Sequence, residues 1–205
     1  MKKIDLTEIA VQGTEWFSSL AILNLCWLLF SLPIITLIPA TDALFTVLNQ
    51  WQVEEKRGKI FANFKYYFKR NFKSSFKLGL PWMIIIVVLG LDIVFLNQQM
   101  NLSAGFQVFK YAFYTLTLIF SGILLYIYPL AKQLGFVQFR LVFTSMLLVF
   151  NYPLVTLGLL ISCGALLLLF SYWPAMLFFF SMSSFAWLAT TATSYALKKN
   201  EEKNE

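Results

Sequence analysis

The sequence contains no histidine and few acidic residues, and these two absences narrow the chemistry open to the protein. Only ten of the 205 residues are Asp or Glu, and between Glu55 and Glu201 the only acid is Asp92. General acid–base catalysis, metal binding and nucleophile activation usually depend on histidine or on paired carboxylates. We therefore expect a protein that is not an enzyme and that needs neither a cofactor nor a metal ion.

Cysteine is scarce, and phosphate-binding and hydrolase motifs are missing. The two cysteines, Cys26 and Cys163, both fall in apolar runs, where a free thiol behaves as a small hydrophobe, so no disulfide framework is indicated. The sequence has no glycine-rich phosphate loop and no GxSxG nucleophile elbow. If the protein takes part in transport, the energy is expected to come from a gradient or from a partner.

Apolar residues are abundant. They make up 59% of the chain against 13% charged residues, and the mean hydropathy is +0.71. A soluble domain carries about 25% charged residues, whereas a membrane span needs about 20 consecutive apolar ones. Five stretches meet that requirement, at residues 20–38, 78–96, 111–130, 152–170 and 174–197. The sequence therefore predicts an all-α integral membrane protein, with residues 1–205 forming one transmembrane domain of about five helices.

Basic residues gather at particular points between these spans. Eight lie between the first and second spans, Lys132 and Arg140 lie between the third and fourth, and Lys198 and Lys199 follow the fifth. The positive-inside rule places these segments and the C-terminus in the cytoplasm, so the net charge of +6 does not indicate a nucleic-acid partner. The N-terminus has two possible positions. Five full spans place it outside, whereas a re-entrant first segment, broken by prolines, places it inside.

Residues 60–77 form a pattern unlike that of a span. Phenylalanines recur at steps of three and four, and each of four lysines follows a phenylalanine by one position, so one helix carries an aromatic row beside a basic row. This is typical of an amphipathic helix in the cytoplasmic interface. It either anchors the chain in lipid or docks a partner, and the candidate residues are Phe61, Phe64, Lys65, Phe68, Lys69, Arg70, Phe72, Lys73, Phe76 and Lys77. A second interfacial helix is expected within residues 133–150.

The first span and its exit carry several polar side chains, and an isolated acid lies in the second span. Polar groups inside a bilayer usually bond to neighbouring helices, so Asn24 and Ser31 indicate helix packing or, alternatively, the lining of a substrate path. A proline pair either bends the chain or exposes backbone groups that bind ions. Asp42 and Asp92 are the candidate intramembrane acids. Asp92 is either functional or merely solvated near the outer surface, where Lys110 is within reach.

Two blocks of the sequence carry a family resemblance. Residues 24–41 read NLCWLLFSLPIITLIPAT, and residues 60–73 contain a Phe-rich basic helix. Both blocks resemble the YesL-like family of bacterial integral membrane proteins, a domain of unknown function. The residues that match the first motif are Asn24, Trp27, Pro33, Thr36, Pro39 and Thr41. The chain departs from the family pattern at Ile38, where glycine is common, and at Asp42, where a small residue is usual.

The resemblance implies a setting for the protein. Members are typically encoded beside carbohydrate ABC importers in Gram-positive bacteria, which implies a multi-pass protein of the bacterial cytoplasmic membrane. It further implies a non-catalytic accessory subunit that contacts membrane lipids and the permease subunits of an oligosaccharide importer. Two alternatives stay open: a standalone transporter or channel for small solutes, and a membrane regulator or assembly factor.

Overall fold

The computed structural model describes residues 6–54, 58–98, 104–135 and 138–204, and the regular structure within them is entirely helical. The elements are α1 (Leu6–Ser31), the 3₁₀ helix η1 (Ile34–Thr36), α2 (Leu37–Glu54), α3 (Ile60–Gln98), α4 (Ala104–Leu134), α5 (Gln138–Asn151), α6 (Pro153–Tyr172) and α7 (Ala175–Asn204). Segments of α1, α3, α4, α6 and α7 are long and apolar enough to cross a membrane. The predicted all-α fold, with five helices long and apolar enough to span a membrane, is confirmed.

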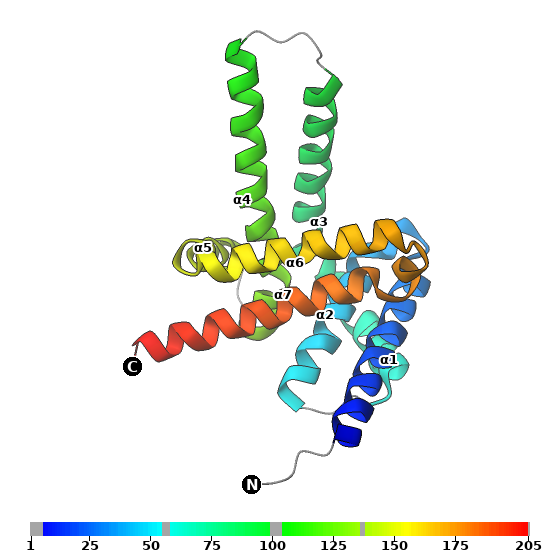
Figure 1. Ribbon diagram of the computed structural model, residues 1–205. Helices are drawn as coiled ribbons and strands as arrows, with labels where there is room; N and C mark the ends of the chain where they lie inside the picture. Colours follow the sequence, from blue (N-terminus) through cyan, green and yellow to red (C-terminus); the bar gives the residue numbers. More distant parts are fainter. Residues whose placement is uncertain (1–5, 55–57, 99–103, 136–137, 205) are drawn as a thin grey trace.

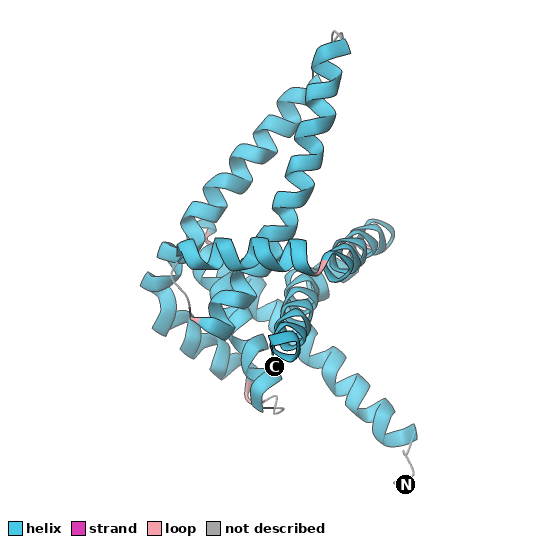
Figure 2. Ribbon diagram, turned by 90° about the vertical axis from the view of Figure 1, so that its left-hand side faces the viewer, coloured by secondary structure: helices cyan, strands magenta, loops and turns pink. Residues whose placement is uncertain are grey.

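The helices form a body and a projecting arm. The arm consists of the second half of α3 and the first half of α4, which run antiparallel and extend well beyond the other helices (Figure 1). The helices α6 and α7 also pair, but they run across the base of the arm and not alongside it (Figures 1 and 2). The body is therefore built where two helical hairpins cross, with α1 and α2 packed beneath them.

The predicted first span, residues 20–38, is not one continuous helix, because α1 ends at Ser31. Pro33 precedes η1, and the chain then reverses direction into α2, an 18-residue helix that hydropathy alone did not reveal. Pro39 lies in the first turn of α2, where its missing N–H leaves no helical hydrogen bond unmade. The start of α1 and the end of α2 consequently lie on the same side of the molecule (Figure 1).

Helix α2 is the centre of the body. Ala40, Ala43, Leu44 and Val47 have no exposed surface, and Leu48 is 2% exposed. The small alanines let neighbouring helices approach closely, and the larger side chains join a core with α1, the start of α3 and α7. A second core gathers α4, α5, α6 and the end of α7 around Tyr126 and Leu141. Because α7 contributes to both cores, it ties the two halves of the body together.

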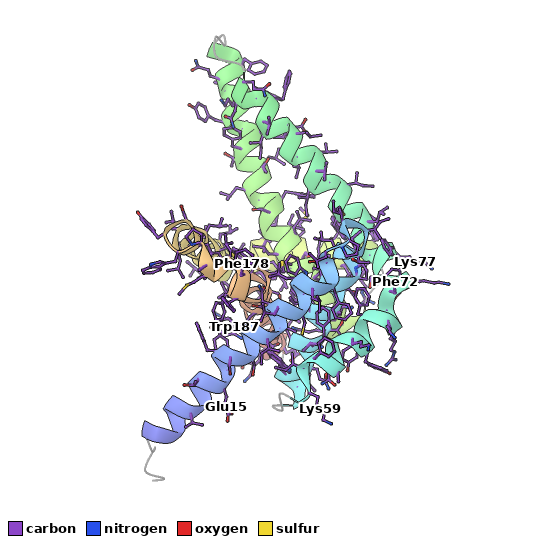
Figure 3. The ribbon with its side chains drawn as sticks, turned by 90° about the vertical axis from the view of Figure 1, so that its right-hand side faces the viewer. Glu15, Lys59, Phe72, Lys77, Phe178 and Trp187 are labelled. Atoms are coloured by element: carbon purple, nitrogen blue, oxygen red, sulfur yellow. The ribbon has the colours of Figure 1, made fainter. Side chains whose placement is uncertain are left out.

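The basic segment at residues 60–77 is helical and continues into the second span without a break, so both belong to the 39-residue helix α3. Pro81 lies inside α3, and the helix bends in this region, beyond Lys77 (Figure 3). The second predicted interfacial stretch corresponds to α5, which ends at Asn151, just before Pro153 opens α6. The basic residues 56–57 and the predicted loop residues 99–101 lie outside the described parts of the chain.

Candidate functional site

Asp42 is the centre of a buried polar cluster that joins three helices. The side chain of Asp42, on α2, is 3% exposed, and its Oδ1 lies 2.6 Å from Nζ of Lys132 near the end of α4. Its other oxygen, Oδ2, accepts a hydrogen bond of 3.1 Å from the side-chain amide of Asn71 on α3. Both carboxylate oxygens therefore have a partner, which is what a buried charge requires.

A further hydrogen bond holds the cation in place. Asn49, two turns after Asp42 on α2, donates from Nδ2 to the backbone oxygen of Lys132 over 3.3 Å. The sequence singled out Asp42 but not its partners, since Lys132 counted only as a loop cation. The sequence held one clue to this pairing: Lys132 follows Tyr128 by four residues, so both lie on the same face of α4. In the structure that face meets α2, because the ring of Tyr128 stacks on that of Phe45 with the ring centres 5.2 Å apart.

Asn24 forms a second polar junction, between α1 and α7. Its side chain is fully buried, and Nδ2 donates to the backbone oxygen of Phe178 over 2.8 Å. Its Oδ1 accepts from the backbone N–H of Ser183 over 3.1 Å. Aromatic packing extends the contact, with the rings of Trp16 and Trp187 at 4.7 Å, and Figure 3 shows Phe178 and Trp187 along α7 beside α1. The amide therefore fastens two candidate spans to each other.

The remaining residues of the first motif close the turn between α1 and α2. Trp27 donates from Nε1 to the hydroxyl of Thr41 over 3.1 Å, a bond across the turn. The hydroxyl of Thr36 lies 2.7 Å from the backbone oxygen of Phe30 and 2.6 Å from that of Pro33. The backbone carbonyl groups of Phe30 and Pro33, at the break in the helix, thus accept hydrogen bonds from the side chain of Thr36. The geometry is that of a stable bend and not of an ion-binding unwound segment.

The aromatic and basic rows of α3 face different surroundings. Phe64 is fully buried, and the ring of Phe30 on α1 lies 5.3 Å from Phe64 and 4.9 Å from Phe68. The prediction that Phe64 belongs to a lipid or partner interface is therefore wrong, because this part of the row packs inward against α1. Phe61 is half exposed, and Phe72 and Phe76 continue the row as edge-to-face neighbours at 5.6 Å.

The basic row of α3 lies on the surface. Its members are exposed side chains that begin one turn into the helix and end at the bend: Lys65, Lys69, Arg70, Lys73 and Lys77. Arg70 donates to the hydroxyl of Tyr66 over 3.1 Å, and its guanidinium lies 5.8 Å from the centre of that ring. We call this surface the basic face, and Figure 3 labels its last member, Lys77. It is the accessible part of the predicted interface.

Asp92 lies apart from these clusters, on the projecting arm. It is exposed, and among the described residues it has neither a hydrogen bond nor an ion pair. The cation expected to reach it, Lys110, instead lies over the ring of Tyr114 at 5.7 Å. Tyr114 in turn donates to the side-chain oxygen of Asn97 over 2.7 Å, which joins α3 and α4 near the tip of the arm.

A cavity of about 810 Å³ lies where the two hairpins cross. Its walls come from α1, α2, α3, α4, α6 and α7, and nearly all of the wall surface is apolar. Its walls include Thr41 and Tyr128, which lie close in sequence to Asp42 and Lys132. Sequence reasoning did not find this cavity, since its walls come from distant segments. Among the described residues, no group of three or more His, Cys, Asp or Glu side chains gathers in a way that could hold a metal ion.

Ile38 and Asp42, the two positions where the chain departs from the family pattern, lie against residues far along the chain. Gly79 of α3 leaves room for Ile38, because a Cβ added at Gly79 would clash with Cγ2 of Ile38 and with the hydroxyl oxygen of Tyr128. Asp42, the other departure, has Lys132 and Asn71. Both unusual side chains are thus accommodated by residues of α3 and α4.

Comparisons with known proteins find a family model and relatives of unknown function. A family model described as "Protein of unknown function, DUF624" matches residues 20–93. "Uncharacterized protein YesL" of Bacillus subtilis (strain 168) is 28% identical over 193 residues, which cover 93% of this chain and 90% of that protein. "Uncharacterized protein YteU" of the same organism is 29% identical over 172 residues, covering 82% and 76% of the two chains. "Uncharacterized protein YesV" is 26% identical over 183 residues, covering 87% and 86%. No solved structure matches the chain.

Proposed function

Since this chain belongs to the YesL-like family of membrane proteins, we propose that it is a non-catalytic accessory subunit of the bacterial cytoplasmic membrane. Its partner in this proposal is the permease of an oligosaccharide ABC importer. The carbohydrate part rests on the genomic setting that the family resemblance implies. The part about interaction rests on the projecting arm, which is the observation that carries the proposal.

The arm offers a long apolar surface for the helices of a partner. On α3 its side chains include Val88, Leu91 and Phe95, which are 50–65% exposed, and on α4 Val108 and Leu116 are 70% and 67% exposed. Within the described chain, the other helices pack around the base of the arm and leave the rest uncovered (Figures 1 and 2). Association of spans depends on close packing and on polar groups that find partners. Asp92, which has no partner among the described residues, gives this surface a polar group that a partner can satisfy.

The internal geometry supports this role over that of a standalone transporter. A path for sugars or ions needs polar walls, whereas the cavity between the hairpins is nearly all apolar. The polar groups of the first motif are bonded within the protein, Trp27 to Thr41 and Asn24 to α7, and Asp42 is paired with Lys132. These side chains hold helices in place, which suits a protein whose task is to present a surface.

The proposal includes an orientation. The basic face of α3 and the C-terminus are placed in the cytoplasm by the positive-inside rule. Because α1 and α2 form a hairpin, the N-terminus then lies in the cytoplasm as well. Single cysteines at Lys2, Lys73 and Lys198, in a variant with Cys26 and Cys163 changed to serine, should all resist a membrane-impermeant maleimide in intact cells. Labelling of any of the three would contradict this orientation.

Co-purification tests the partner. The tagged protein, extracted from its native membrane in mild detergent, should carry both permease subunits of an oligosaccharide importer, identified by mass spectrometry. Leu116→Trp on the arm should lower their recovery by about tenfold, an amount that corresponds to about 1.4 kcal/mol of binding free energy. Ile161→Trp on α6 is the matched control, because Ile161 is 71% exposed but lies off the arm.

The outcomes separate the parts of the proposal. Recovery of the protein alone, as a stable monomer or homo-oligomer, would contradict the accessory role. Equal losses of the permease with both variants would contradict the assignment of the arm as the contact surface. Sugar or ion movement through liposomes that contain only this protein would favour the transporter.

A further inference from the structure

The cavity between the hairpins opens sideways. Ile86 and Val87 of α3 belong to its wall and are also 54% and 52% exposed on the outer surface. The same holds for Leu167 of α6, which is 60% exposed. The opening therefore lies between α3 and α6. Both helices are candidate membrane spans, so the medium outside this opening is the hydrocarbon of the bilayer and not water.

Water is a poor occupant of this space. Voids larger than a water molecule are few in protein interiors, and a buried water needs two to four polar partners. The polar groups of the wall are few: the hydroxyl of Thr41 accepts from Trp27, and that of Ser121 donates to the backbone oxygen of Leu118 over 2.7 Å. The indole N–H of Trp82 is buried without a hydrogen-bond partner among the described residues, and one such donor is too few to hold a water. An apolar occupant loses nothing by leaving the bilayer and gains contact with the walls.

We propose that the cavity binds one acyl chain of a membrane phospholipid, which enters between α3 and α6. The volume of about 810 Å³ is within the range of about 300–1,000 Å³ typical of ligand pockets. The chain extends along the apolar walls toward Tyr128, while its headgroup stays outside the protein. The lipid thereby fills the space between the arm and the α6–α7 hairpin. This inference concerns lipid binding by the chain itself and is independent of the proposed importer partner.

Two glycines of α6 provide a matched pair of variants. A Cβ added at Gly164 or at Gly158 would meet nothing within 4 Å, so either position accepts a side chain. Gly164 lies in the wall of the cavity, whereas Gly158 is exposed and lies outside the wall. Gly164→Phe places a ring inside the cavity, and Gly158→Phe places the same ring on the outer surface.

The experiment counts phospholipids that stay bound after extensive washing in detergent, by lipid extraction and mass spectrometry. The parent protein and Gly158→Phe should each retain about one phospholipid per chain, and Gly164→Phe should retain about tenfold less. A second measurement, the melting temperature, distinguishes a blocked cavity from a variant that has failed to fold. After complete delipidation, Gly164→Phe should melt at a higher temperature than the parent, because its ring fills the empty cavity. Added phospholipid should raise the melting temperature of the parent and of Gly158→Phe but not that of Gly164→Phe.

Three results would overturn the inference. The first is a folded, monodisperse parent protein that retains no phospholipid and gains no stability from it. The second is equal retention by the two phenylalanine variants. The third is stoichiometric recovery of a different apolar molecule, such as an isoprenoid, in place of phospholipid. Loss of the permease partner leaves each of these measurements unchanged, so the two proposals fail separately.

Discussion

The ion pair between Asp42 and Lys132 provides a quantitative test of how the body is held together. At 2.6 Å and an effective dielectric constant of 20, the attraction between two unit charges is about 6 kcal/mol. Dehydration of both groups offsets most of it, so the net value of a buried pair is small. Removal of one partner is different, because it leaves the other charge buried. The perturbations are therefore Lys132→Met, Asp42→Asn and the double substitution.

The expected costs differ between the two single variants. Lys132→Met leaves a carboxylate that is 3% exposed with only the amide of Asn71, and it should lower the free energy of unfolding by about 3–5 kcal/mol. Asp42→Asn should cost less, about 1–3 kcal/mol, because Lys132 is 16% exposed and its long side chain can turn toward water. The double variant should cost about 0–2 kcal/mol, since it leaves neither charge buried.

Unfolding in mixed micelles of mild detergent and sodium dodecyl sulfate measures these free energies, with all four proteins at one pH and one ionic strength. The cycle should give a coupling energy of about 5 kcal/mol, since the two single costs together are much larger than the cost of the double variant. Lys69→Met, on the basic face of α3, is the control and should change stability by less than about 0.5 kcal/mol. Additive single costs, or a Lys132→Met variant as stable as the control, would refute the buried-pair reasoning.

Three further predictions concern the helix junctions. Asn24→Leu removes the hydrogen bonds of the Asn24 side chain to α7 and should cost about 1–2 kcal/mol in the same unfolding assay, whereas Ser31→Ala, which loses only a bond within its own helix, should cost less than about 0.5 kcal/mol. Gly79→Ala forces a methyl group against α2 and α4 and should cost about 1–3 kcal/mol, but Gly90→Ala, with open space around it, should raise stability by about 0.5–1 kcal/mol; equal effects would contradict the close packing. Trp27→Phe removes the bond across the α1–α2 turn and should cost about 0.5–1.5 kcal/mol, and an unchanged midpoint would show that the turn is held otherwise.

The fold class was predictable because hydropathy follows directly from the order of residues. Spans are identified by length and apolar character, and five were found. Hydropathy did not predict helix α2, because α2 is buried against other helices of the protein and not in lipid. Asp42 and Asn49 make its sequence too polar to be read as a span. Their partners, Lys132 and Asn71, lie on helices that local pattern cannot place.

The site was predictable only in part, for a related reason. The steps of three and four at residues 60–77 correctly indicated a helix with two distinct rows. They did not indicate which row faces lipid, because the inward orientation of Phe64 depends on Phe30 in a different helix. The motif residues Asn24 and Trp27 were identified, but their bonding partners in α7 and across the α1–α2 turn follow only from the three-dimensional arrangement.

The central position of α2 has a consequence for how the protein is assembled. Lys132 is synthesised about 90 residues after Asp42, which at about 5–20 residues per second is a delay of roughly 5–18 s. The partners of Asn24, in α7, are made later still. Until then the carboxylate of Asp42 has only the amide of Asn71 as a partner, although α1 and α3 can already pack against α2. Residues 20–93, the part that the family model matches, are thus completed by contacts with α4 and α7, which are made after them.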